Sequence, residues 1–349
     1  WDRFDVLVMP PSFPYGGMEN PRLTFASPTL LTGDRSLTTV VAHELAHAWA
    51  GNLVTNATWN DFWLNEGVTV YLELRMNEAL WGAERAEMLK TFGWRELEAE
   101  IERAGATSPD TRLRYDMAGR DPAVGVTAIP YLKGAAFFWS LERLLGRPRI
   151  DRWLRGWFDR HAFTSVTTDA LLRDLEAHLF GGGPPPLDLA AWIDAPGVPA
   201  DGAPEPSRAL EAIDAAAEAF TRGGSAAALG AETWIPAEWR HFIGSLLRGP
   251  IDASRLQALD DAHHLSTSTN AEILCAWLRL GARAHWDPAL PIVERFLLEH
   301  GRGKYLRPLY SELLTSDWGR ATAERAYAAA RPRYHALVRG ALDRLFSAS

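Results

Sequence analysis

Two histidines four residues apart stand out as side chains that could bind a metal ion. They lie in His43-Glu44-Leu45-Ala46-His47, an H-E-x-x-H motif, inside a stretch whose apolar residues recur at helical spacing. Side chains four residues apart share one face of a helix, so both imidazoles can bind one divalent ion. Glu44 projects at the edge of that face, where it can reach a metal-bound water without binding the metal. The motif predicts a metal site that activates water; the alternative is a chance pairing on an ordinary helix.

A third ligand is needed, because catalytic zinc usually has three protein ligands and a water molecule. The candidate is Glu66, and eighteen residues separate it from His47, enough for a helix end, a loop and a return. Two imidazoles and one carboxylate suit zinc better than calcium or magnesium, so we expect one zinc ion. The alternative for Glu66 is a first-turn carboxylate that the helix dipole stabilises.

The elements that must position these residues follow from the apolar pattern. Residues 4–9 are expected to form a buried strand, followed by turns rich in proline and glycine. We expect a first helix over 37–53 and a second over about 62–79, so that the histidines and Glu66 lie on consecutive helices. Further helices are expected at about 83–104, 131–145, 149–159 and 168–179.

The sequence changes character near residue 200. Residues 181–186 read Gly-Gly-Gly-Pro-Pro-Pro, and four prolines lie within 196–206, which is typical of a domain boundary. Beyond it, helical patterns rich in alanine and leucine are separated by glycine or proline, which predicts stacked antiparallel helices without a strict repeat. We therefore predict a first domain at 1–200, with a linker at about 181–206, and a helical domain at 207–349.

Composition excludes several classes of partner. Among 349 residues, 47% are hydrophobic and 23% charged, which is ordinary for a globular chain with a sizeable core. The 36 Lys and Arg against 44 Asp and Glu give a formal net charge of -8, which argues against binding nucleic acid. No apolar run approaches the ~18 residues that a membrane span needs.

The single cysteine and the start of the chain bear on its cellular context. Cys275 cannot form an intrachain disulfide and is expected to be a small buried hydrophobe, and we expect a cytoplasmic location. The sequence opens at Trp1, directly before the first strand and without an initiator methionine. We interpret it as part of a longer protein, whose signal peptide, if one exists, would lie upstream.

Three motifs in order resemble those of the gluzincin aminopeptidases, the family of aminopeptidase N and leukotriene A-4 hydrolase. Residues 16–20, Gly-Gly-Met-Glu-Asn, match the exopeptidase signature G-x-M-E-N. The H-E-x-x-H motif follows, with Glu66 after it. Residues 130–134, Pro-Tyr-Leu-Lys-Gly, match the motif of the catalytic tyrosine. Residues 10–15, 51–56 and 301–304 are most similar to the leukotriene A-4 hydrolase branch.

The resemblance implies a role for each matching residue. His43, His47 and Glu66 would bind zinc. Glu44 would take a proton from the attacking water, and Tyr131 would donate a hydrogen bond to the oxyanion. Taken without its motif, Tyr131 is an ordinary half-buried tyrosine at a helix start.

The resemblance also implies how a peptide would bind. Glu19 would pair with the free α-amine of the substrate, which fixes cleavage at the first residue. The signature residues Gly16, Gly17 and Met18 would lie along the substrate, with the glycines letting its backbone approach; an ordinary turn is the alternative. Arg302 and Lys304 would hold the carboxylate end of short peptides; the alternative is a solvated basic pair.

The implied fold is α+β and predominantly helical. A thermolysin-like zinc catalytic domain would be followed by an all-α domain of armadillo- or HEAT-like helix pairs. The implied function is zinc-dependent removal of N-terminal residues from short peptides that have a free N-terminus. The family also carries an upstream β-rich domain that this chain lacks, so we expect exposed apolar surface around the first strand. No other obligate protein partner is expected.

Two departures bear on the alternatives. The leukotriene A-4 hydrolase branch has an aspartate, associated with epoxide hydrolysis, at the position of Ala123, and a tyrosine at that of Val126. These departures argue against a bifunctional epoxide hydrolase and aminopeptidase. The other alternative is a non-catalytic peptide-binding module with structural zinc, against which Glu44 and Tyr131 argue.

Overall fold

The computed structural model describes residues 2–122 and 126–348, which form two compact units. Unit 1 comprises residues 1–5, 19–24 and 41–207, and unit 2 comprises 6–18, 25–40 and 208–349. Each unit has its own hydrophobic core. The domain boundary near residue 200 and the linker at about 181–206 stay predictions. Within the described ranges, no helix is long and apolar enough to cross a membrane.

The first forty residues hold three short strands, and the division between the units falls within two of them. These strands are β1 (Asp5–Val8), β2 (Gly17–Met18) and β3 (Leu23–Ala26), in the order β1-β3-β2. Strands β2 and β3 pair antiparallel, with Gly17 opposite Ala26. The 3₁₀ turn Pro28–Leu30 follows.

The expectation that the first strand is buried is wrong. Val6, Leu7 and Val8 are each 46% exposed. Consecutive strand residues point to opposite faces of a sheet, so β1 is incompletely covered on both faces; it is also an edge strand, paired with β3 alone among the described strands. Leu23 on β3 is 42% exposed, so apolar surface does lie around the first strand, as expected.

Unit 1 is built on two long helices, α2 (Trp63–Trp81) and α5 (Ile129–Leu145), which pack closely against each other. Gly67 and Gly134 meet at their crossing, where a Cβ on Gly67 would lie 2.7 Å from the Gly134 Cα. Trp63, Phe137 and Phe138 fill the core beside them, with Trp63 edge-on to Phe137. The close crossing determines how the first turns of both helices face each other.

The remaining elements of unit 1 surround this pair. They are α1 (Thr38–Ala46), whose first turn belongs to unit 2, α3 (Ala83–Ala104), α6 (Arg147–Arg160), α7 (Thr168–Asp174) and α8 (Leu189–Ile193), with 3₁₀ turns at Trp59–Asp61, Pro109–Thr111 and Ala200–Gly202 and a π turn at Leu175–Leu179. Strand β4 (Val54–Asn56) runs parallel to β5 (Thr164–Val166). The helices predicted from residue 62 onward are therefore present, with small shifts at their ends.

The first helix is shorter than predicted. It ends at Ala46 rather than near residue 53, because Gly51 has a φ of 109° and turns the chain back. In that turn the Asn52 N–H donates to the His47 carbonyl and the Gly51 N–H donates to the Val54 carbonyl. The apolar spacing continues through the turn, and for this reason periodicity alone overestimates the helix.

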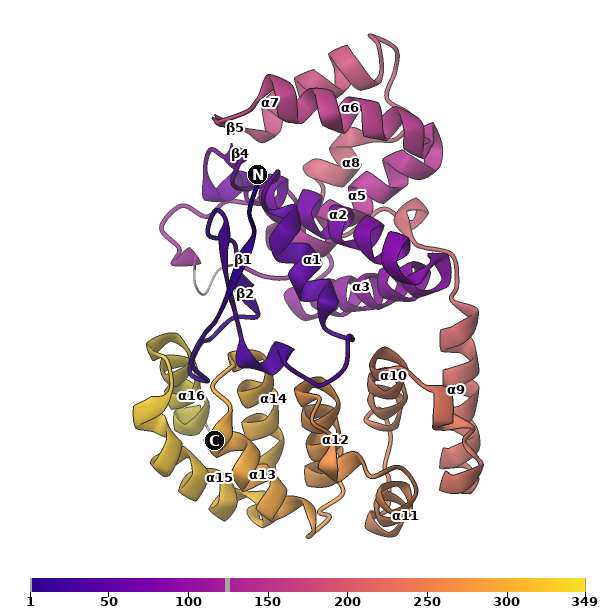
Figure 1. The fold of residues 1–349 in the computed structure, drawn as a ribbon, viewed down its shortest axis with the longest axis vertical. Helices are drawn as coiled ribbons and strands as arrows, with labels where there is room; N and C mark the ends of the chain where they lie inside the picture. Colours follow the sequence, from indigo (N-terminus) through magenta and orange to yellow (C-terminus); the bar gives the residue numbers. More distant parts are fainter. Residues whose placement is uncertain (1, 123–125, 349) are drawn as a thin grey trace. The chain divides into compact units, whose positions relative to one another are not determined.

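From Arg208 onward, unit 2 contains eight helices in its described residues, arranged in rows (Figure 1). They are α9 (Arg208–Thr221), α10 (Pro236–Leu246), α11 (Ala253–His263), α12 (Ala271–Arg283), α13 (Ala289–Glu299), α14 (Gly303–Leu313), α15 (Asp317–Ala330) and α16 (Ala336–Ala348), with 3₁₀ turns at Ala226–Ala228, Ala231–Thr233, Leu265–Thr267 and Arg331–Arg333. Helices α10, α12, α14 and α16 pack in succession, and α13 packs on α15. The prediction of a predominantly helical α+β fold with stacked helices at its end is confirmed.

Candidate metal centre

The two histidines of α1 converge as their spacing predicts. The His47 N–H donates to the His43 carbonyl, so the helical geometry extends to His47 although α1 itself ends at Ala46. Their Nε2 atoms lie 3.2 Å apart, and the rings are edge to face with centroids 4.7 Å apart. His47 is buried, and His43 is partly open. Two nitrogen atoms so close together leave room for one shared cation.

Glu66 completes this pair from the first turn of α2. Its Oε2 lies 3.2 Å from the His43 Nε2 and 3.5 Å from the His47 Nε2. The start of α2 is held by Asp61, whose Oδ1 accepts hydrogen bonds from the N–H and hydroxyl of Thr168. The turn after α1 and the anchored start of α2 therefore place the Glu66 carboxylate beside the two imidazoles.

The three side chains fit a zinc ion. The Glu66 Oε2 is buried and without a hydrogen-bond partner in the structure, and such an atom is costly unless a cation neutralises it. The ligand atoms of His43, His47 and Glu66 all lie within 4.8 Å of one another. Burial alone would raise the pKa of Glu66, but the neighbouring His43 ring and the charge of His47 outweigh it, so the pKa is lowered. An ionised carboxylate and two imidazoles are the donor set that zinc takes.

Glu44 and Glu19 lie beside this group. A carboxylate oxygen of each and a ring nitrogen of His47 fall within 4.8 Å of one another. Glu44 is buried, and burial first, then the charges of Glu19 and Glu66, raise its pKa to about 8, against the lowering effect of His43. A bound divalent cation would oppose this rise by favouring the ionised form. The cluster brings a buried potential base and a second carboxylate to one side of the metal ligands.

Tyr131 reaches the same place from the first turn of α5. Its ring stacks against that of His43 with centroids 6.4 Å apart, and its hydroxyl donates to Glu66. Burial and the charge of Glu66 raise the pKa of Tyr131 well above its usual value, so the phenol keeps its proton. Pro130 in the first turn favours the helix start, and the glycine crossing brings it to α2.

Sequence reasoning missed the side chains that orient the histidines. The His43 Nδ1 lies 3.1 Å from the Glu73 Oε2, while the His47 Nδ1 lies 3.0 Å from the Ala50 carbonyl and 3.1 Å from the Thr69 hydroxyl. Glu66, Thr69 and Glu73 are spaced i, i+3 and i+7 on α2, so they share a face of that helix. That spacing is visible in the sequence and is the signal that could have identified them.

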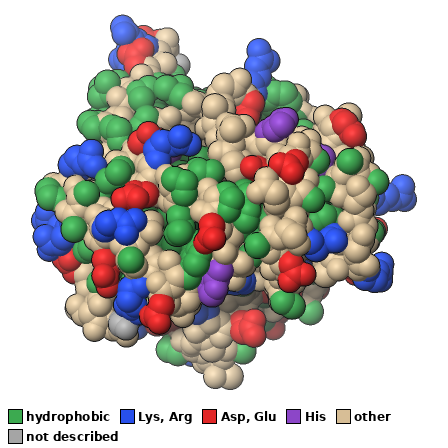
Figure 2. All heavy atoms as spheres, turned by 90° about the horizontal axis from the view of Figure 1, so that it is seen from below, with side chains coloured by type: hydrophobic (Ala, Val, Ile, Leu, Met, Phe, Trp, Pro, Cys, Tyr) green, Lys and Arg blue, Asp and Glu red, His purple; other side chains and the backbone are tan. Residues whose placement is uncertain are grey.

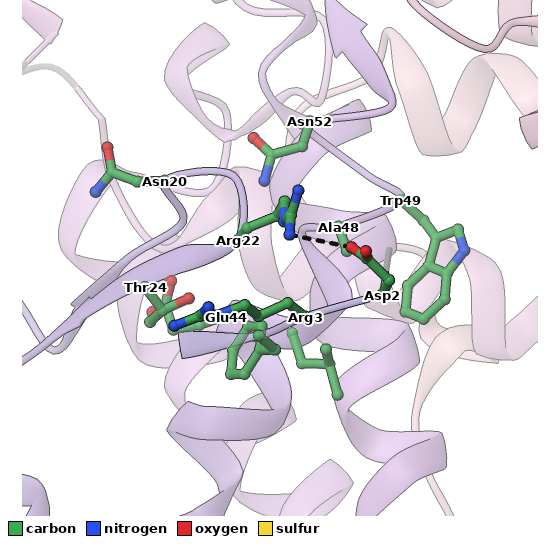
Figure 3. A pocket seen from close by; sticks show the side chains of 11 residues that line it. Asp2, Arg3, Asn20, Arg22, Thr24, Glu44, Ala48, Trp49 and Asn52 are labelled. Atoms are coloured by element: carbon green, nitrogen blue, oxygen red, sulfur yellow. Dashed lines mark ion pairs between the residues drawn. The ribbon is translucent and has the colours of Figure 1, made fainter. Parts of the chain in front are cut away.

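A pocket of about 320 Å³ opens next to Glu44 in unit 1 (Figure 3). Its lining comes from residues 2–4, from the loop with Asn20 and Arg22, from Thr24 on β3, and from α1 and the turn after it. Asp2 and Arg22 form an ion pair across it at 3.1 Å. The buried candidate base therefore borders this pocket.

The remaining predicted substrate residues lie in unit 2. Gly17 and Met18 form β2, and Met18 is 37% exposed. The Arg302 guanidinium lies against Gly16, where a Cβ would be only 2.5 Å from its Nη2. A side chain at position 16 would therefore displace the Arg302 guanidinium, whatever the relation of Gly16 to a substrate.

Arg302 and Lys304 share a counter-ion that the sequence did not reveal. The Glu272 Oε1 accepts hydrogen bonds from the Lys304 ammonium at 2.7 Å and the Tyr305 hydroxyl at 2.7 Å. Arg240 contributes a further ion pair to Glu272 at 3.4 Å, and Arg302 lies 3.9 Å from it. Three cations against one carboxylate leave this cluster with an excess of positive charge, which suits an anionic ligand.

Comparison with known proteins decides the family. The model of the peptidase family M1 domain matches residues 1–185, and that of the leukotriene A4 hydrolase C-terminal domain matches residues 234–346. The chain belongs to peptidase family M1. The resemblance that the motifs indicate is therefore confirmed.

Two relatives and one solved structure show how far the similarity of this M1 chain extends. It is 36% identical over 344 residues to leukotriene A-4 hydrolase of Xenopus laevis, covering 92% of this chain and 54% of the relative. It is 35% identical to leucine aminopeptidase 2 of Ajellomyces capsulatus, covering 99% of this chain and 56% of that relative. The structure of yeast LTA4 hydrolase with bestatin superposes with a TM-score of 0.85 at 29% identity. The match covers 97% of this chain and 58% of the yeast chain.

The M1 chain thus spans about half the length of the curated relatives that it matches. Of the two departures from the leukotriene A-4 hydrolase branch, Val126 is described in the structure, whereas Ala123 lies outside the described residues.

Proposed function

We propose that this chain carries the zinc site of an aminopeptidase that removes the first residue from short peptides. The observation that carries the proposal is the convergence of His43 and His47 on a buried Glu66 oxygen that makes no hydrogen bond. Glu44 and Glu19 next to it supply what a structural zinc site does not need. Family membership supports the same reading.

One zinc ion held by the three ligands would supply the Lewis acid that acidifies water and polarises a carbonyl. Glu44 accepts the proton of the attacking water and passes it to the leaving amine. Tyr131 keeps its proton and donates a hydrogen bond to the oxygen on which negative charge develops. Glu19 pairs with the substrate ammonium, which sets cleavage one residue from the N-terminus.

The carboxylate end of a short peptide would be bound by Arg302 and Lys304. Their cluster with Glu272 and Arg240 supports this assignment through its excess of positive charge. Gly16, Gly17 and Met18 would border the substrate, as the family signature implies. Val126 in place of a tyrosine speaks against epoxide hydrolysis as a second activity.

Hydrolysis of aminoacyl-anilides and tripeptides by the zinc-loaded protein tests the proposal. We expect turnover that a zinc chelator abolishes and that zinc restores. Glu44→Gln should lower kcat by about 10²–10⁴-fold, the usual contribution of a general base, while it still binds one zinc ion. One bound zinc without turnover in the wild type would contradict the proposal and favour a peptide-binding module instead.

A further inference from the structure

The turn after the zinc-site helix is tied to the exopeptidase loop by one side chain. The Asn52 Nδ2 donates a hydrogen bond of 2.8 Å to the main-chain carbonyl of Glu19, thirty-three residues away in the sequence. In Figure 3, Asn52 extends from that turn toward the loop that carries Asn20 and Arg22. Asn52 lies in residues 51–56, one of the segments that resemble the family, but the sequence does not reveal its contact with Glu19.

The same residue is anchored to the metal site through its backbone. The Asn52 N–H donates to the carbonyl of His47 at 3.0 Å, so one residue contacts both a metal ligand and Glu19. Two further contacts hold the turn around it: the Thr55 hydroxyl donates to the Gly51 carbonyl at 2.7 Å, and Gly51 lies against Asn65. A shift of Asn52 would therefore move Glu19 relative to the metal ligands.

The distance between Glu19 and the metal matters because it selects which bond is cleaved. One residue of extended chain spans ~3.3–3.6 Å, so the ammonium must be held to within a fraction of that length. A misplacement of about 1 Å can cost about 10²-fold in rate. A fixed hydrogen bond to the Glu19 main chain leaves its carboxylate free for the substrate.

We infer that Asn52 is a positioning residue that sets Glu19 at the correct distance from the metal for binding the substrate's α-ammonium group. The inference rests on the proposed function, since it requires Glu19 to bind an amine. Asn52 acts through Glu19 and needs no contact with the substrate. Loss of the Asn52 side chain should weaken binding of the substrate's ammonium group more than it weakens binding of a ligand to the metal ion.

A pair of inhibitors separates these two effects. Leucine hydroxamate and its des-amino analogue, 4-methylpentanohydroxamate, carry the same metal-binding group, but only the first carries an ammonium group. The ratio of their inhibition constants on the zinc-loaded protein therefore measures amine recognition. We expect a ratio of about tenfold to a hundredfold for the wild type, since a charged hydrogen bond contributes roughly 1.5–3 kcal/mol.

Asn52→Asp replaces the donor with an acceptor of the same shape, and it should lower the ratio about tenfold while the des-amino compound binds within threefold of wild type. Asn52→Ala is measured in parallel, in case the added charge prevents folding, and zinc stoichiometry is determined for each variant. The matched control is Asn56→Asp, because the Asn56 amide also donates to a main-chain carbonyl, that of Thr58. It should leave the ratio unchanged.

A double-mutant cycle shows whether Asn52 acts through Glu19. In the Glu19→Gln background, where the ratio is already low, Asn52→Asp should cause no further change. A wild-type ratio retained in both Asn52 variants, or an equal loss of both inhibitors, would overturn the inference and leave the proposed function intact. A wild-type ratio near one, with no anilide turnover, would overturn both.

Discussion

At the scale of single residues, the two histidines of the proposed zinc site differ in what holds their second ring nitrogen. Glu73 holds His43 through a carboxylate, whereas His47 is held by the Ala50 carbonyl and the Thr69 hydroxyl. A carboxylate behind a ligating histidine fixes the ring and makes the opposite nitrogen a stronger donor. The two ligands should therefore respond differently to substitution.

We expect Glu73→Gln to weaken zinc binding by about 10–100-fold, the usual effect of removing such a partner. Thr69→Val should weaken it less, because the Ala50 carbonyl remains to hold His47. Competition with a chromophoric chelator measures both affinities. Equal losses in the two variants would contradict the assigned difference.

Glu272 is a second residue whose environment leads to a prediction, in this case about stability in acid. Burial would raise its pKa, but Lys304, Arg240 and the Tyr305 hydroxyl outweigh this and lower the pKa to about 2. A carboxyl group with a lowered pKa stabilises the fold above its unfolded pKa, and this stabilisation is lost as the pH falls toward the folded value. The relevant window therefore runs from about pH 4.5 down to about pH 2.

In that window the wild-type free energy of unfolding should fall more steeply than that of Glu272→Gln. The difference should reach on the order of 3 kcal/mol, since each unit of pKa shift corresponds to about 1.4 kcal/mol. Denaturant titrations of both metal-free proteins at several pH values measure it, so loss of zinc in acid does not enter. Parallel curves for the two proteins would show that the ion cluster does not stabilise the fold.

At the scale of elements, the crossing of α2 and α5 links the packing of unit 1 to its chemistry. Glu66 and Tyr131 lie on the first turns of these helices, and Gly67 and Gly134 allow the helices to approach. A glycine inside a helix costs roughly 0.5–1 kcal/mol relative to alanine, so the close approach must offset that cost.

Gly134→Ala should destabilise the protein by about 1–3 kcal/mol, because its Cβ would lie 2.8 Å from the Gly67 Cα. Gly93→Ala on α3 is the matched control: its Cβ would meet only a side-chain methyl of Leu132 at 3.4 Å. Chemical denaturation compares the two, and the control should be neutral or stabilised. An equally stable Gly134→Ala variant would mean that the crossing tolerates wider spacing.

The sequence predicts most elements well and fails where the chain turns. The amphipathic patterns identify the helices from Trp63 onward, and the motif spacing predicts that His43, His47 and Glu66 converge. Periodicity does not reveal that α1 ends at Ala46, since apolar spacing continues through a turn that depends on a left-handed Gly51. Nor does it reveal Glu272, because nothing local in the sequence links it to Lys304.

At the scale of the whole molecule, one face of the surface illustrates how charged side chains are distributed. The face in Figure 2 shows acidic, basic and apolar side chains interspersed. On this face the basic side chains form no continuous patch of the kind that binds an extended polyanion.

Cys275 offers a probe of the folded state of unit 2. The thiol is 5% exposed, and burial raises its pKa to about 12, as expected for a buried hydrophobe. It should therefore not react with an aromatic disulfide reagent at pH 8 until the unit unfolds, and then it should react fully. Rapid labelling of the native protein would show that this core opens readily.

The way the chain alternates between the two units has a consequence for dissecting the gene. A fragment that begins at Arg208 would omit residues 6–18 and 25–40, which belong to unit 2. It would leave the Thr269 hydroxyl without the Thr32 carbonyl, and the Asn270 amide without the Ser36 hydroxyl. A single cut in the DNA therefore cannot yield either unit whole; an intact second unit requires the early segments to be grafted back, as in a circular permutant.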